Sequence, residues 1–216
     1  NFNYGFSEEK FRTTGYFSSR LNTKTNSSIY INSGSKAEQF NASEPISPII
    51  NTVATLFFEE NFMKLYEKNF AKASYQQEVT NGLFMFGSLE YSERKPLFNT
   101  TDNVFIQNDD KIYTSNNPLD PNDYTTGGII KHNLMKANIN ARINFGQKYM
   151  TRPDGKYNMR SDKYPSLFLG YEKGFAGNES RYNFDYVQGL VDYDKTLGNK
   201  GDFAIRMKAG KFFNAD

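Results

Sequence analysis

The sequence contains no cysteine, no tryptophan and a single histidine. Without cysteine, the chain can form neither a disulfide framework nor a thiolate metal site. It also lacks any apolar run near the roughly 18 residues that a membrane-spanning helix requires. Its net charge of +2, from 26 basic and 24 acidic residues, is too small to indicate a nucleic-acid partner. We therefore expect no cofactor, no metal site and no nucleic-acid partner.

Aromatic side chains are abundant, although apolar residues as a whole are few. Phenylalanine (20) and tyrosine (15) make up an aromatic fraction of 16%, whereas all hydrophobic residues together reach only 38%. A chain this polar has little material for a large dry core. In a membrane β-barrel, half of each strand faces water and aromatic girdles lie at both interfaces, which accounts for both fractions.

Residues 135–146 alternate without interruption between apolar and polar side chains. The odd positions hold Met135, Ala137, Ile139, Ala141, Ile143 and Phe145, and every even position is polar or glycine. Strands of soluble sheets are commonly five or six residues long. A twelve-residue run with one apolar face better fits a tilted strand that crosses a bilayer, with its apolar face to lipid and its polar face to a lumen.

Further strands are expected along the whole chain. The pattern indicates strands at 1–7, 11–21, 27–40, 83–94, 166–172, 181–194 and 202–213, with a weaker candidate at 70–79. Asn81 and Gly82 form a strong hairpin signal, and a slip of the alternation near Gly189 predicts a bulge there. About nine strands cannot close a bacterial barrel, which has an even number. The sequence therefore predicts an all-β, antiparallel transmembrane β-barrel segment, with 1–216 as part of one outer-membrane domain of a longer chain.

One helix interrupts this pattern. Ser47 and Pro48 provide a helix start, because proline at the first helical position loses no hydrogen bond. Apolar residues continue at helical spacing, and Glu60 and Lys64 lie one turn apart. We predict a helix over 48–65, either as a connector at the rim of a barrel or as a plug or partner-binding element.

The long polar stretch 95–130 predicts a loop on the exterior side of a barrel, where loops are long. Within it, residues 108–123 are rich in aspartate and asparagine but lack the spacing of a calcium-binding EF-hand. His132 follows the loop. A catalytic triad could draw on Ser88, Ser92, Asp109 or Asp110, but no nucleophile motif marks any of them. We therefore expect no enzymatic activity.

Two sets of basic residues are candidates for binding. The first set lies on the polar faces of its strands and predicts a lumen wall that favours anionic solutes, unless Glu172, Asp185 and Glu90 neutralise it. Its members are Lys136, Arg142, Arg206 and Lys208. The second set lies with tyrosines in the connector 147–165 and could contact lipid phosphates or a partner protein, although a solvated connector is the simpler interpretation. Its members are Lys148, Arg152, Lys156, Arg160 and Lys163.

Several strings of residues, in order along the chain, resemble a known family. They are NTVATLFFEENFMKLYEK (51–68), NG (81–82), RKPLFNT (94–100), GQKY (146–149), KYPSL (163–167) and GYEKG (170–174). They are similar to the Bacteroidota family of uncharacterised outer-membrane proteins that carry a carboxypeptidase-like regulatory domain ahead of a predicted barrel. The resemblance implies an outer-membrane location, a barrel and an upstream regulatory domain, and it supplies no catalytic residues.

These observations favour an outer-membrane barrel segment in a protein of unknown activity that takes part in transport or envelope assembly. Its expected partners are the lipid bilayer and periplasmic or envelope proteins. The alternative is a soluble all-β module that binds glycans or proteins through its many tyrosines. An outer-membrane hydrolase is a third hypothesis, which would require a triad around His132.

Overall fold

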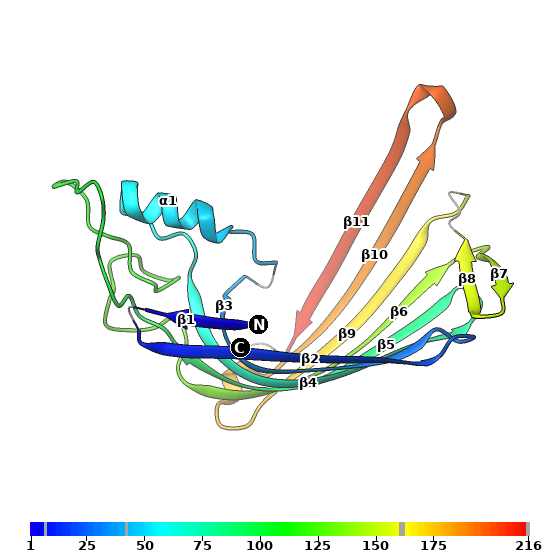
Figure 1. Ribbon diagram of the computed structural model, residues 1–216, viewed down its shortest axis with the longest axis horizontal. Coiled ribbons are helices and arrows are strands. Elements are labelled where there is room, and N and C mark those ends of the chain that lie inside the picture. The colour runs from blue at the N-terminus through cyan, green and yellow to red at the C-terminus, as the bar shows by residue number, and fades with distance from the viewer. Residues whose placement is uncertain (7, 42, 160–162, 215–216) are drawn as a thin grey trace. The chain divides into compact units, whose positions relative to one another are not determined.

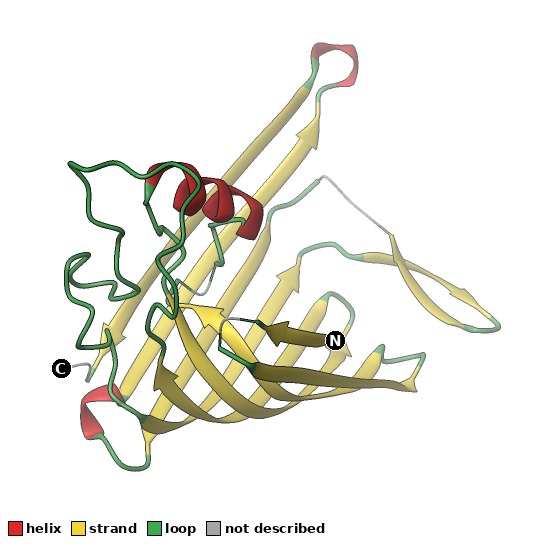
Figure 2. Ribbon diagram, turned by 60° about the vertical axis from the view of Figure 1, so that its left-hand side comes forward, coloured by secondary structure: helices red, strands yellow, loops and turns green. Residues whose placement is uncertain are grey.

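The computed structural model describes residues 1–6, 8–41, 43–159 and 163–214, and over them it is predominantly β (Figures 1 and 2). The strands are β1 (Phe2–Gly5), β2 (Lys10–Asn22), β3 (Ser27–Gln39), β4 (Leu65–Thr80), β5 (Leu83–Pro96), β6 (His132–Asn144), β7 (Lys148–Arg152), β8 (Gly155–Met159), β9 (Ser166–Ala176), β10 (Phe184–Thr196) and β11 (Asp202–Phe213). The helices are α1 (Pro48–Phe58) and the 3-10 turns η1 (Ser180–Tyr182) and η2 (Gly198–Lys200).

Nine strands form one large antiparallel sheet in the order β1-β2-β3-β4-β5-β6-β9-β10-β11. The all-β prediction and the nine strands expected for it are confirmed. Among the described residues no pairing joins β1 to β11, so the sheet is open rather than closed. Strands β7 and β8 form a separate two-stranded sheet.

The chain divides into two compact units. Unit 1 comprises Asn1–Gly15, Ser33–Phe70 and Ser92–Asn133, and unit 2 comprises Tyr16–Asn32, Ala71–Tyr91 and Leu134–Asp216. The strands β2 to β6 each contribute residues to both units.

In unit 1, α1 begins where predicted but ends seven residues early. Ser47 has extended backbone and Pro48 opens the helix, whereas Glu59 adopts a left-handed conformation with φ of 60° and ends it. The segment after Glu59 does not continue the helix, and Asn51 Oδ1 accepts the N–H groups of Phe62 and Met63, each at 2.8 Å. The predicted helix over 48–65 is therefore wrong beyond residue 58. No helix within the described residues is long and apolar enough to cross a membrane.

The long loop of unit 1 carries no helix or strand between residues 97 and 131, as predicted, and runs as an extended green trace in Figure 2. It is nonetheless tied down by side-chain amides. Asn116 Nδ2 donates to the carbonyl oxygens of Leu65 and Leu97, at 2.6 and 2.7 Å, and Asn116 Oδ1 accepts from Leu65 N–H at 2.9 Å. The loop is thus fixed to the start of β4 and to the residue after β5.

In unit 2, β6, β9, β10 and β11 pair over long, continuous registers. Residues of β10 from Phe184 to Asp192 pair one for one with β9, and those from Asp185 to Thr196 pair one for one with β11. The predicted bulge at Gly189 is therefore wrong, because the ladder does not slip there. The irregular alternation comes from the choice of side chains and not from the backbone.

Two elements were poorly anticipated by sequence. Strand β4 was only a weak candidate, yet at 16 residues it is the longest of the described strands. The connector 147–165, for which the sequence predicts no strand, contains the β7–β8 hairpin.

Candidate functional site

Strand pairing divides unit 2 into two faces of opposite character. Directly paired residues of antiparallel strands project to the same side of a sheet. One row contains Ile139, Tyr171 and Val187, and another contains Ile143, Leu167, Val191 and Met207. We call this side the apolar face.

The apolar face is exposed over all four of these strands. Ile139 is 59% exposed, Met207 is 61% exposed and Val187 is 47% exposed. Strands β4 and β5 continue the pattern, with Tyr75, Val79, Leu89 and Tyr91 exposed at odd positions and Ser74, Glu78 and Glu90 buried at even ones. Among the described residues of unit 2, Leu134 is the one large apolar side chain that is fully buried.

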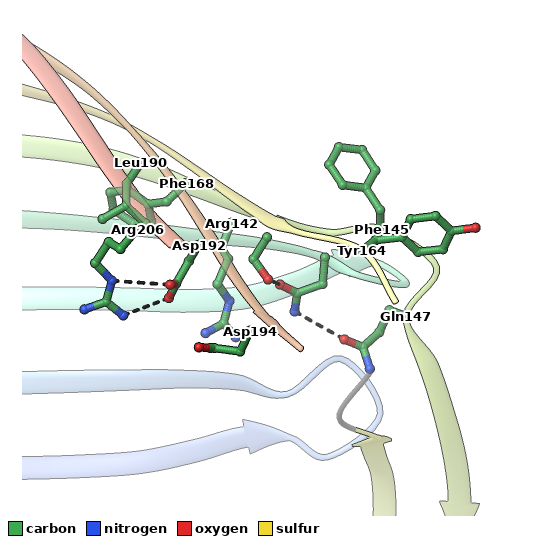
Figure 3. Close-up of a pocket in the computed structure, with 11 residues that line it drawn as sticks. Arg142, Phe145, Gln147, Tyr164, Phe168, Leu190, Asp192, Asp194 and Arg206 are labelled. Atoms are coloured by element: carbon green, nitrogen blue, oxygen red, sulfur yellow. Dashed lines mark hydrogen bonds and ion pairs between the residues drawn. The ribbon is translucent and has the colours of Figure 1, made fainter. Parts of the chain in front are cut away.

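The opposite side, the polar face, carries hydrogen-bonding and charged groups. One row joins Asn144, Ser166, Asp192 and Arg206, and the next joins Arg142, Phe168, Leu190 and Lys208. All of these residues except Lys208 line a cavity of about 560 Å³, together with Phe145, Gln147, Tyr164 and Asp194 (Figure 3). The cavity is a candidate binding site on the polar face of unit 2.

Hydrogen bonds fix several of the cavity's groups. Arg206 and Asp192 point toward one another in Figure 3, with Nη2 and Nε of the arginine 2.8 and 3.3 Å from the two carboxylate oxygens. Ser166 Oγ donates to Asn144 Oδ1 at 2.9 Å, and Asn144 Nδ2 donates to Gln147 Oε1 at 3.2 Å. Such groups can bind a hydroxylated or charged solute by hydrogen bonds.

All four residues predicted to face the lumen lie on the polar face, but two of them are neutralised. Lys136 Nζ lies 3.7 Å from Glu172 Oε1, and Arg206 is paired with Asp192. Arg142 lies over the ring of Phe84 at 4.7 Å. Lys208 has no ion-pair partner among the described residues.

Of the carboxylates expected to neutralise this set, Glu172 does so. Asp185 lies on the apolar face instead, where its oxygens are 2.9 and 3.1 Å from Lys173 Nζ. Glu90 is buried. The partner that sequence reasoning missed is Asp192, which could be assigned to Arg206 only once the register of β10 and β11 was known.

The second basic set is gathered largely in and around the β7–β8 hairpin. Lys148 and Arg152 lie on β7, Lys156 lies on β8, and Lys163 contacts the ring of Tyr164 at 5.2 Å. Arg160 lies outside the described residues. The roles predicted for both basic sets stay predictions.

Glu78 is the central polar residue of this end of unit 2, and the sequence did not single it out. It is 3% exposed, and its carboxylate accepts four hydrogen bonds. The donors are Lys156 Nζ at 2.7 Å, Gly82 N–H at 3.0 Å, Asn158 Nδ2 at 3.1 Å and Asn26 Nδ2 at 3.2 Å. One carboxylate therefore joins the β2–β3 turn, the β4–β5 turn and the β7–β8 hairpin.

Two of the residues weighed for catalysis, His132 and Ser88, make hydrogen bonds in the structure. His132 is 1% exposed, and its Nδ1 lies 2.8 Å from the carbonyl oxygen of Ile130. Ser88 accepts a hydrogen bond from Asn138 Nδ2 at 2.7 Å. Within the described residues no group of three histidine or acidic side chains is arranged to hold a metal. The expectation that the protein is not an enzyme stays a prediction.

In the aspartate-rich loop, Asp123 closes a turn. Its carboxylate accepts hydrogen bonds from the hydroxyl and N–H groups of Thr126 and Thr125. These donors, with the Thr126 hydroxyl foremost, hold the pKa of Asp123 well below its usual range. The arrangement is that of a structural turn.

Comparison with protein families gives one result. A family model described as a family of unknown function (DUF5686), C-terminal domain, matches residues 1–216. The chain belongs to this family. No curated protein and no solved structure matches the chain. Membership of the DUF5686 C-terminal domain family agrees with the expected unknown activity, and nothing in the match bears on an upstream regulatory domain or on a bacterial group.

Proposed function

We propose that this chain forms part of the wall of a bacterial outer-membrane β-barrel. In this proposal, the apolar face of unit 2 contacts lipid and the polar face lines the lumen. The protein takes part in transport or envelope assembly and is not an enzyme. Its partners are the lipid bilayer and periplasmic or envelope proteins.

The observation that carries the proposal is the distribution of apolar side chains in unit 2, which is the inverse of that in a protein folded in water. Buried apolar area is the main source of stability in water, at about 25 cal/mol for each Å². Here large apolar residues of six neighbouring strands are exposed on one face, while serine, asparagine and glutamate lie on the other. Monomeric proteins in water rarely expose a contiguous apolar patch of more than a few hundred Å². A lipid environment removes this conflict.

The length of the apolar face supports the same environment. It runs from Ala71 to Val79 in β4, from Leu83 to Tyr91 in β5, from Met135 to Ile143 in β6 and from Leu167 to Phe175 in β9, which is nine residues in every case. A tilted strand crosses the hydrocarbon core with about 9–11 residues. Phe145 and Tyr164, both exposed just beyond this span, suit the aromatic girdle of an interface.

The character of the polar face supports a lumen for small polar solutes. Its cations Arg142 and Lys208, which have no carboxylate partner within the described part of the chain, lie in one row with Phe168 and Leu190 between them. Because Glu172 and Asp192 neutralise the other two, the preference for anions is expected to be weaker than the sequence alone implied.

The test is the behaviour of the full-length protein in detergent. A β-type circular dichroism spectrum, a gel mobility that changes on boiling, and solute flux after reconstitution into vesicles are the expected results. A monodisperse protein that needs no detergent and shows no mobility change would overturn the proposal. It would favour a soluble all-β module that binds glycans or proteins.

A further inference from the structure

Within unit 2, the β7–β8 hairpin is held against the β2–β3 turn along one of its strands. Lys156 N–H, on β8, donates to the carbonyl oxygen of Thr23 at 3.2 Å. A Cβ atom at Gly155 would lie 2.9 Å from Thr23 Cβ, so the backbones approach closely there. The outer edge of β8 is therefore occupied by the β2–β3 turn.

The opposite edge of the hairpin, formed by β7, has no strand partner in the described part of the chain. Among the described residues β7 pairs with β8 alone, and all five of its residues are exposed. Thr151 is paired with Lys156, whose N–H points away from β7 toward Thr23. In such a pair both residues direct their N–H and C=O groups outward. The backbone groups of Thr151, and those of Tyr149 two residues earlier, therefore lie at the open edge of β7.

The two faces of the hairpin differ in whether their cationic side chains are paired with a carboxylate. The inner face contains Lys156 and Asn158, which bind Glu78, and Tyr149, whose ring lies 4.4 Å from Lys156 Nζ. The outer face follows from the alternation of strand residues and carries Lys148, Met150 and Arg152 on β7.

Lys148 and Arg152 have no carboxylate partner among the described residues. The nearby acids are already engaged, Glu78 by Lys156 and Asp154 by the hydroxyl of Tyr157. The guanidinium of Arg152 lies over the Tyr157 ring at 5.2 Å. The exposed strand thus carries a cation at position 148, an apolar residue at position 150 and a second cation at position 152.

We infer that β7 is a docking strand for an extended acidic segment of a partner protein. The segment adds to the open edge through the backbone groups of Tyr149 and Thr151. It carries acidic residues at positions i and i+4, beside Lys148 and Arg152, and an apolar residue at i+2, beside Met150. Recognition by strand addition combines main-chain hydrogen bonds with side-chain pairs of this spacing.

The fixed position of the hairpin favours this use. A free two-stranded hairpin is barely stable in water. Here the four hydrogen bonds of Glu78 order the hairpin and the two neighbouring turns before any partner arrives. Little further ordering of β7 is needed on binding, which lowers the entropic cost.

The first test uses the full chain and a fluorescein-labelled peptide, TDTVTDT, with TKTVTKT as the charge-reversed control. Fluorescence anisotropy at low salt is expected to show binding of the acidic peptide alone. The double variant Lys148→Glu with Arg152→Glu should bind it at least about tenfold more weakly and should now prefer the lysine peptide. Lys195→Glu with Lys200→Glu, at another turn, is the matched control and should leave binding unchanged.

The second test separates strand addition from simple charge attraction. Thr151→Pro removes an N–H that points outward and leaves every charge in place, so it should weaken binding about tenfold, whereas Thr151→Ala should not. Circular dichroism of each variant reports that the fold is retained.

Three results would overturn the inference. They are no binding by the unaltered chain, binding indifferent to the charge reversal, and binding indifferent to Thr151→Pro. Binding to phosphatidylglycerol vesicles that depends on Lys148 and Arg152, with none to the peptide, would also overturn it in favour of lipid headgroups. The inference is independent of the proposed function, because peptide binding is measured in the same way whether or not the protein requires detergent.

Discussion

Lys156 Nζ lies 2.7 Å from Oε1 of Glu78, and Glu78 precedes Lys156 by 78 positions in the chain. The carboxylate side chain is 1% exposed and the lysine side chain is 14% exposed. The pair is therefore shielded from solvent on the acidic side, and three further donors complete the shell of Glu78.

Replacement of Glu78 should destabilise this end of unit 2. Glu78→Gln leaves the Lys156 charge without its partner and sets an amide N–H₂ against the donors of Asn26 and Asn158. We expect a loss of about 2–3 kcal/mol, less than for a fully buried pair because Lys156 can turn toward solvent. The loss in stability is measured by denaturant unfolding, with tryptic cleavage within 147–159 as the probe of opening. The matched control is Glu60→Gln, which breaks an exposed pair with Lys111 and should cost under about 1 kcal/mol. Equal losses for the two variants would contradict the role assigned to Glu78.

Adjacent positions of β6 should respond in opposite ways to arginine. Ile139 lies on the apolar face and Asn140 on the polar face. If the apolar face contacts lipid, Ile139→Arg should destabilise the inserted protein by about 2–4 kcal/mol, whereas Asn140→Arg should be tolerated. Unfolding from lipid vesicles measures both. In water an exposed isoleucine can be exchanged for arginine at little cost, so a neutral Ile139→Arg would contradict the lipid-facing assignment.

The turn at Gly82 should not accept a side chain. Gly82 has φ of 82°, and a Cβ atom there would lie 2.5 Å from the carbonyl oxygen of Asn144. Gly82→Ala should therefore cost at least about 1–2 kcal/mol, from the left-handed backbone alone. Gly177→Ala is the control, since nothing lies within 4 Å of its Cβ position. The midpoints of urea unfolding compare the two, and similar midpoints would show that the Gly82 turn is looser than described.

The Asp123 turn should persist in moderately acid solution. Because its pKa is lowered in the folded loop, the carboxylate contributes stability above its ordinary pKa of 3.8, and this is lost as the pH falls toward the lower folded value. Proteolysis of residues 117–126 should therefore be as slow at pH 5 as at pH 7. Asp123→Asn should accelerate cleavage at both pH values, while Asp109→Asn should not. A wild-type loop that opens between pH 7 and pH 5 would contradict the assignment.

The local sequence pattern predicts which face of a strand each residue occupies. It does not predict which residues of other strands that residue contacts. The alternation in 135–146 predicted which residues of β6 share a side, and Asn81 with Gly82 predicted the β4–β5 turn, because both signals lie within a few residues of sequence. The sequence pattern underestimates strand β4 because alanine and glutamine weaken its contrast, although most of its odd positions from Ala71 to Val79 are exposed. The end of α1 depends on Asn51 binding residues 62 and 63, which no helical pattern reveals.

The candidate site depended still more on contacts distant in sequence. Arg206 and Lys208 were correctly placed on the polar face, but the neutralisation of Arg206 needed the pairing of β10 with β11. The sequence pattern does not reveal the hairpin in 147–165, because contacts hold it to Glu78 and Thr23, which precede their partner Lys156 by 78 and 133 residues.

Asn144 and Ser166 are directly paired across β6 and β9. The chain thus leaves the large sheet and returns to it at neighbouring points, and residues 145–165 form an excursion that the ladder does not count. A change within the hairpin therefore does not alter the register between β6 and β9, but it can remove two of the four donors that bind Glu78 of β4. The recognition strand β7 can thus vary on a constant framework as long as Lys156 and Asn158 of β8 are kept.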